Sequence, residues 1–123
     1  MYVTHDGLGP VLEGLYKEGY IALQTAVTAP HEYEGNEIER VITLGNSTHK
    51  IDVVVSRMSL SIAPIFQFHS SVVMNYVSVD TFFSAYPSLT MESIGFVNPL
   101  IQFWKWLTPS TLMLINKYRL RGY

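Results

Sequence analysis

The sequence predicts an α+β fold: a small mixed or antiparallel sheet with a central β-hairpin, an N-terminal helix, and C-terminal helices packed on the sheet. Three observations predict it. An apolar stripe at helical spacing comes early in the chain, strand-like runs separated by turn residues follow, and two helix-start signals come near the end. The 123 residues contain no internal repeat and are expected to form a single domain over 1–123.

The first predicted helix begins near Gly9-Pro10 and ends at Gly19. Proline suits the first helical position, and glycine suits the position just after the last turn. The apolar face of this helix consists of Val11, Leu12, Leu15 and Tyr16, which recur at helical spacing.

The clearest predicted element is an antiparallel hairpin. Residues 38–44 and 49–56 are strand-like and flank the short loop 45–48, whose first two residues tolerate positive φ. A further strand is expected over 20–28, just before the hairpin. In the second hairpin strand, a period of two places Ile51, Val53 and Val55 on the inward face. Lys50, Asp52, Val54 and Ser56 fall on the opposite, more polar face.

The middle of the chain gives mixed signals. Residues 58–68 are ambiguous, because Pro64 prevents a long uninterrupted helix. Residues 69–78 read as a strand. Residues 80–86 read as a short helix that is capped by Asp80 and ended by Pro87.

Two helices are predicted at the end of the chain. Asn98-Pro99 and Thr108-Pro109 repeat one signal, a capping residue followed by proline at the first turn. We therefore expect helices over 99–107 and 109–121, with Gly122 as the stop of the second. The second helix has an apolar side made of Leu112, Ile115 and Tyr118.

Composition favours association over catalysis. Apolar residues make up 48% of the chain and charged residues only 15%, against about 25% in typical soluble domains. So few charges suggest that apolar surface is covered by self-association. The absence of cysteine excludes disulfides, thiolate metal sites and cysteine nucleophiles.

Charge and hydropathy bear on partners and compartment. Residues 1–40 carry a net charge of −5 and the remainder +3, which favours intermolecular pairing and makes a nucleic-acid face unlikely. No apolar run approaches the roughly 20 residues of a membrane span. Because no signal peptide is visible, the cytoplasm or nucleus is the expected compartment.

The predicted helix 99–107 supplies a candidate interface. Phe103 and Leu107 lie four apart and share one stripe. Trp104 and Trp106 lie two apart, about 200° round the axis, so at least one indole should reach the surface. Phe103, Trp104 and Trp106 are therefore predicted to form the interface of a symmetric dimer, or to bind an unidentified protein partner.

Few residues are candidates for catalysis or metal binding. Asp52 is expected to decorate the polar face of its strand, paired with Lys50 or with Arg40 across the hairpin. The acidic run Glu32, Glu34, Glu37 and Glu39 lacks the oxygen pattern of a calcium loop, and the four histidines form no close helical pair. No metal site is therefore predicted.

One basic cluster lies near the C-terminus. Lys117, Arg119 and Arg121 could bind phosphate, with Tyr118 or Tyr123 stacking on a base. The simpler interpretation is that these cations oppose the dipole at the end of their helix.

Four stretches carry a resemblance to known proteins: H-K-I-D-V-V-V-S, P-I-F-Q-F-H-S-S-V-V-M-N, A-Y-P-S-L-T and K-Y-R-L-R-G-Y. In this order they resemble a group of uncharacterised fungal predicted proteins and, more distantly, the C-terminal half of nucleotidyltransferase-fold domains. In those domains a helix ending in Gly-Tyr, here Gly19-Tyr20, precedes a hairpin. The likeness runs over most of the chain from about Gly14 onward.

The resemblance implies two-metal phosphoryl chemistry, which needs a glycine-rich turn, a paired D-x-[DE] and a third carboxylate. Only Asp6, Glu13 and Glu18 lie ahead of Gly19-Tyr20, and the third carboxylate would fall near His69. We therefore expect a degenerate domain without a cofactor, a binding and assembly module that forms a homo-oligomer. The alternative is a nucleotide- or nucleic-acid-binding nucleotidyltransferase-type enzyme, or a fragment of one, which uses Mg²⁺ with Asp52, Lys117, Arg119 and Arg121.

Overall fold

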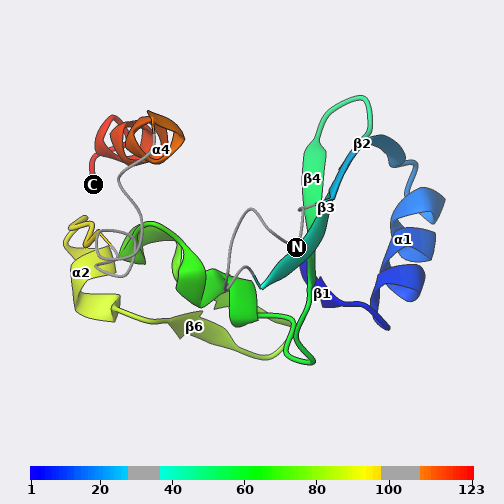
Figure 1. Ribbon diagram of the computed structural model, residues 1–123, viewed down its shortest axis with the longest axis horizontal. Coiled ribbons are helices and arrows are strands. Elements are labelled where there is room, and N and C mark those ends of the chain that lie inside the picture. Colours follow the sequence, from blue (N-terminus) through cyan, green and yellow to red (C-terminus); the bar gives the residue numbers. More distant parts are fainter. Residues whose placement is uncertain (28–36, 98–108) are drawn as a thin grey trace. The chain divides into compact units, whose positions relative to one another are not determined.

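The computed structural model describes residues 1–27, 37–97 and 109–123, which fall into two compact units, Met1–Pro64 and Ile65–Tyr123. Both units contain helix and strand, so the predicted α+β class is confirmed (Figure 1). That the two form one domain stays a prediction.

The first unit contains β1 (Tyr2–Thr4), α1 (Leu8–Lys17), β2 (Ile21–Val27), β3 (Ile38–Gly45) and β4 (Lys50–Ser56). Its four described strands form one sheet in the order β1-β4-β3-β2. β1 runs parallel to β4, whereas β2–β3 and β3–β4 are antiparallel. The predicted hairpin is therefore the centre of a mixed sheet, and β2 lies at an edge.

α1 ends in a Schellman motif. The Tyr20 amide donates to the Leu15 carbonyl at 3.0 Å, and the Gly19 amide donates to the Tyr16 carbonyl at 3.1 Å. Gly19 has φ +81°, a left-handed conformation that glycine adopts without steric penalty. The predicted helix stop is confirmed, and the chain turns directly into β2.

The core of the first unit lies between α1 and one face of the sheet, along which α1 runs in Figure 1. Its buried sheet residues are Val3, Ile42, Leu44, Val53 and Val55, and Leu8, Val11, Leu12, Leu15, Tyr20 and Ile51 pack against them. Tyr16, which the sequence assigned to the apolar face of the helix, is 49% exposed. It lies roughly 90° from the centre of the buried stripe, too far round the helix to reach the sheet.

The faces of β4 follow the predicted alternation only in part. Asp52 is exposed, while Val53 and Val55 are fully buried, as expected. Val54 and Ser56, however, are also buried. Val54 has strand neighbours on both sides, and the Ser56 hydroxyl donates to the Leu60 carbonyl at 3.0 Å in the turn that follows β4.

One glycine of the hairpin is explained by packing. A Cβ built on Gly45 would lie 2.7 Å from Cδ1 of Leu23, in the adjacent strand β2. Leu23 is also the extra residue of a β-bulge, because Ala22 pairs with Leu44 and Gln24 with Thr43. The absent side chain at position 45 leaves the space that Leu23 fills.

The region after β4 begins with a short 3-10 helix, η1 (Ala63–Gln67), which fits the presence of Pro64. The second unit continues with η2 (Ser71–Val73), β5 (Asn75–Val77), β6 (Phe82–Ser84), α2 (Pro87–Met91) and α4 (Pro109–Arg119). The predicted strand over 69–78 is wrong in its first half. There the Ser70 hydroxyl accepts from the Val72 amide at 3.3 Å and caps the turn η2 instead.

The predicted helix over 80–86 is wrong. Asp80 accepts from the Ser78 hydroxyl at 2.9 Å and the Thr81 hydroxyl at 3.1 Å, so it closes the β5–β6 turn and does not cap a helix. Phe83 of β6 stacks on Tyr76 of β5, with ring centroids 5.0 Å apart. Pro87 begins α2, whereas the prediction was that Pro87 ends a helix.

α4 begins at Pro109, as predicted, and ends in a second Schellman motif. The Tyr123 amide donates to the Tyr118 carbonyl at 3.2 Å, and Gly122 has φ +97°. Ile115 and Tyr118 are partly buried, but Leu112 is 50% exposed and does not belong to the buried side. The predicted helix 99–107 lies outside the described residues.

Candidate functional site

Asp52 lies on the exposed face of β4, directly opposite Thr43 of β3. The Thr43 hydroxyl donates to Oδ1 of Asp52 at 2.7 Å. The expected cross-strand partner Arg40 lies opposite Val55, and its Nε donates to Glu39 at 3.0 Å. Asp52 therefore takes part in a cross-strand hydrogen bond with threonine, and the predicted pairing with Arg40 is wrong.

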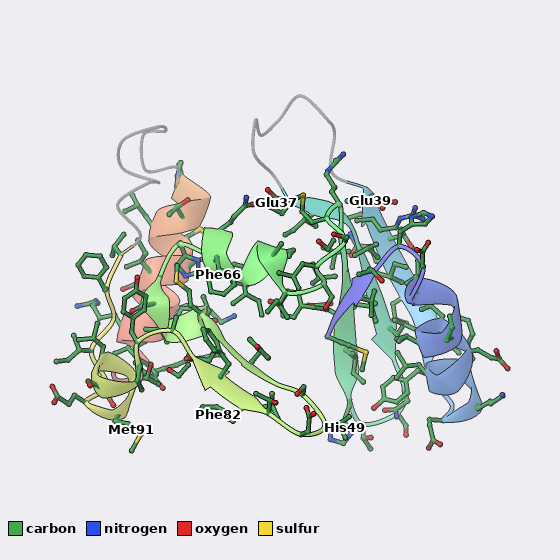
Figure 2. The ribbon with its side chains drawn as sticks, turned by 90° about the horizontal axis from the view of Figure 1, so that it is seen from below. Glu37, Glu39, His49, Phe66, Phe82 and Met91 are labelled. Atoms are coloured by element: carbon green, nitrogen blue, oxygen red, sulfur yellow. The ribbon has the colours of Figure 1, made fainter. Side chains whose placement is uncertain are left out.

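Glu39, one of the two described members of the acidic run, forms ion pairs with Arg40 and His5. Glu39 accepts from Arg40, and its Oε2 lies 3.2 Å from Nδ1 of His5, which precedes α1. The hydrogen bond from Arg40, helped by the one with His5, holds the pKa of Glu39 below its ordinary value. In Figure 2, Glu39 lies at the opposite end of the β3–β4 hairpin from His49. Glu32 and Glu34 lie outside the described residues.

Two of the three predicted phosphate-binding cations gather round one ring. Nζ of Lys117 lies 6.0 Å from the ring centroid of Tyr118, and the guanidinium carbon of Arg121 lies 5.4 Å from it. Arg119 is engaged elsewhere and donates to Oδ1 of Asn116 at 3.1 and 3.2 Å. Asp52 belongs to the first unit and this basic cluster to the second.

His69 lies next to the Tyr118 ring and was not predicted as a site residue. Its ring centroid lies 5.7 Å from that of Tyr118, and the residue is 9% exposed. Nε2 is buried and has no hydrogen-bond partner among the described residues. Burial lowers the pKa of His69, so its neutral form is favoured. The cluster of Lys117, Tyr118, Arg121 and His69 is called the Tyr118 cluster below.

The geometry gives no support for a serine–histidine pair between His69 and Ser71. The Ser71 hydroxyl accepts from the Phe96 amide at 2.9 Å, and the Ser71 amide donates to the Phe96 carbonyl at 2.9 Å. Ser71 therefore ties the η2 turn to the segment after α2. That role is structural.

Two further buried polar atoms lie in the β5–β6 hairpin. Oδ1 of Asn75 and Oγ of Ser84 have no hydrogen-bond partner among the described residues, and the two residues are directly opposite each other in the register. Burying an unsatisfied polar atom costs about 1–3 kcal/mol. This end of the hairpin is therefore a point of weakness in the second unit.

The predicted interface residues Phe103, Trp104 and Trp106 lie outside the described residues. The second unit nevertheless exposes large apolar side chains. Phe82 of β6 is 69% exposed and Met91 of α2 is 86% exposed, and Figure 2 shows both on the outside of their elements. Val77, Val79, Met113 and Leu120 are also largely exposed.

The metal that the nucleotidyltransferase resemblance implies does not fit the described residues. No three histidine or carboxylate side chains gather in residues 1–27, 37–97 and 109–123. Asp52, the acid of the alternative hypothesis, is bonded to Thr43. No step through Mg²⁺ follows from this arrangement.

No helix within the described parts of the chain is both long enough and apolar enough to cross a bilayer. Comparisons with protein-family models, with curated proteins and with solved structures found no match. The function is therefore inferred from the residues themselves.

Proposed function

We propose that this chain is a non-catalytic binding and assembly module whose first partner is a second copy of itself. The observation that carries the proposal is the exposure of large apolar side chains in a chain with few charges. Val77, Val79 and Phe82, for example, surround the turn of one short hairpin and are each at least two-thirds exposed. Contiguous apolar surface of this kind is usually covered by a protein partner.

The test is the oligomeric state of the purified chain. We expect sedimentation equilibrium at micromolar concentration to give twice the monomer mass, because a module that exposes this much apolar surface should associate. A chain that stays monomeric throughout that range would contradict self-association.

The proposal has two finer parts. One is descent from a nucleotidyltransferase-like domain that has lost its catalytic set, and the other is action in the cytoplasm or nucleus. Their support is the sequence: the four stretches that carry the resemblance and the lack of a visible signal peptide.

A second candidate function is phosphate or nucleotide binding by the Tyr118 cluster. The observation that favours it is the approach of two cations, Lys117 and Arg121, to one aromatic ring. Cations give charge-assisted bonds to phosphate, and an aromatic face can stack on a base.

Calorimetry with each nucleoside triphosphate, with and without Mg²⁺, separates the two functions. For an assembly module we expect no saturable heat with any of them. Saturable binding that is lost in Lys117→Gln and Arg121→Gln but kept in Arg119→Gln would favour the nucleotide site, because Arg119 bonds to Asn116 and not to the Tyr118 ring. Loss in Asp52→Asn as well would favour the enzyme.

A further inference from the structure

The turn of the β5–β6 hairpin carries exposed apolar side chains on an ordered backbone. Val77 and Phe82 are directly opposite each other in the register, so they share one face of the hairpin, and Val79 follows in the turn. Val77 is 76% exposed, Phe82 is 69% exposed and Val79 is fully exposed. The turn is closed by a backbone hydrogen bond of 2.8 Å from the Ser78 amide to the Thr81 carbonyl. A surface that is ordered before binding loses less entropy when a partner covers it.

A single negative charge lies within this apolar surface. The carboxylate of Asp80 accepts hydrogen bonds from the hydroxyl groups of Ser78 and Thr81, and these bonds hold its pKa below the ordinary value. Asp80 is therefore ionised at neutral pH, and it makes no ion pair with a described residue. Val77, Val79, Asp80 and Phe82 are called the hairpin tip below. A partner surface that complements the hairpin tip offers apolar side chains with a cation between them.

One side of α4 offers that combination. Met113, Lys117 and Leu120 are four and three residues apart, so they lie on one side of the helix. Leu120 directly follows α4, and its amide donates to the Asn116 carbonyl at 3.0 Å, which continues the helical turn. Met113 is 73% exposed and Leu120 is 76% exposed, and Lys117 between them is exposed as well. These three residues are called the α4 stripe below.

The charge of Lys117 is available for a partner, whereas several other described cations are already engaged. Lys17 and Arg40 are paired with carboxylates of the first unit. Arg57 donates to a backbone carbonyl, and Arg119 donates to the side-chain amide of its own helix. Lys117 makes no ion pair with a described residue. The α4 stripe therefore matches the hairpin tip in both charge and apolar character.

We propose that the hairpin tip of one copy docks on the α4 stripe of a second copy, with Asp80 of one copy paired to Lys117 of the other. This inference rests on the proposed function and specifies the two surfaces that meet. Both surfaces belong to the second unit. Two copies related by a two-fold axis make the contact twice, because each copy supplies one hairpin tip and one α4 stripe.

The apolar part of the contact is tested with Val79→Ser. Because Val79 is fully exposed, the substitution removes no packing within the chain. We expect sedimentation equilibrium to show the dimer weakened about tenfold or more, since two buried valines are lost in each dimer. Met91→Gln removes a side chain of α2 that is 86% exposed and is the matched control, which should leave the dimer unchanged. Equal weakening by Met91→Gln would overturn the assignment of the hairpin tip.

The charge pairing is tested by a change of sign. Asp80→Asn keeps an oxygen that accepts the hydroxyl bonds of the turn, and it should weaken the wild-type dimer about threefold because the ion pair is lost. Lys117→Glu should weaken the dimer about tenfold or more, because two carboxylates then face each other. In the Lys117→Glu chain, Asp80→Asn should instead strengthen the dimer, since it removes that repulsion.

Arg119→Glu is the matched control for this change of sign. It alters the net charge by the same amount as Lys117→Glu, but it lies about 200° round the helix from Lys117. In the Arg119→Glu chain, Asp80→Asn should still weaken the dimer. Circular dichroism checks that each variant is folded.

The outcomes separate this inference from the proposed function. A monomeric wild type contradicts both. A wild-type dimer that neither Val79→Ser nor Lys117→Glu weakens overturns this contact and leaves self-association standing, in which case a monomeric Trp104→Glu would point to the segment 103–106. If Asp80→Asn does not strengthen the Lys117→Glu dimer, Lys117 faces a different group, and the proposed pairing is overturned.

Discussion

The burial of His69 makes the stability of the folded chain depend on pH. The imidazole is buried against Tyr118, and its pKa is lowered because burial disfavours the charged form. In the unfolded chain the same residue titrates near its ordinary value, about 6.5. Between the lowered pKa and that value the unfolded chain binds more protons than the folded one. The stability from neutral His69 is thus complete above about pH 6.5 and is lost as the pH falls towards the lowered pKa.

We therefore expect the second unit to lose stability on mild acidification through His69. The urea midpoint of unfolding, followed by circular dichroism, should fall as the pH is lowered from neutral, and it should fall less in His69→Gln. His49→Gln, at the exposed loop of the first unit, is the matched control and should keep the wild-type dependence. Equal acid sensitivity in wild type and His69→Gln would show that His69 is not the responsible group. Lys117 and Arg121 lie next to the Tyr118 ring, and their glutamine variants measure whether these charges contribute to the acid sensitivity.

The residues of the candidate site differ in how far the sequence could predict them. Asp52 was placed on the exposed face of its strand because alternation needs only local spacing. Its partner Thr43 was missed, because the partner depends on the register of two strands. Lys117 and Arg121 stood out as a charge cluster, but the third predicted member, Arg119, is bonded to Asn116. The burial of His69 depends on contacts with α4, far along the chain, and no local pattern signals it.

At the scale of the element, α1 offers a test of two glycines with opposite expected signs. Gly19→Ala should destabilise the first unit by about 1 kcal/mol or more, because φ +81° is strained for any residue with a Cβ. Gly14→Ala should stabilise it by about 0.5–1 kcal/mol, because Gly14 is inside the helix and an added Cβ meets nothing within 4 Å. Urea unfolding followed by circular dichroism measures both changes. A Gly19→Ala variant that is as stable as wild type would mean that the end of α1 is not held by the Schellman motif.

Elements with a strong local signal were predicted well. α1 and α4 have proline near the start and glycine at the end, and the β3–β4 hairpin has strand-like runs on both sides of a turn. The region from 69 to 86 was predicted poorly. Ser70, Ser78 and Asp80 bond to nearby backbone or hydroxyl groups, and these short-range bonds compete with the helix or strand that propensity suggests. The stacking of Tyr76 on Phe83 then favours a hairpin.

At the scale of the whole molecule, α+β class, an internal hairpin and exposed apolar surface all follow from composition and pattern. The division into Met1–Pro64 and Ile65–Tyr123 does not, because a single Pro64 within an ambiguous stretch is a weak boundary signal. The edge position of β2 also could not be predicted, since strand order in a sheet depends on long-range pairing.

The contact between Leu23 and Gly45 has a consequence for how this sequence can vary during evolution. A Cβ at position 45 would lie 2.7 Å from a methyl group of Leu23, so the two positions share one volume across adjacent strands. A larger residue at 45 becomes acceptable when Leu23 rotates away or is replaced by a smaller residue. Among related sequences, a gain of side chain at 45 should therefore be accompanied by a loss at 23. The pair would then change as a single inherited unit, although 22 positions separate its members in the chain.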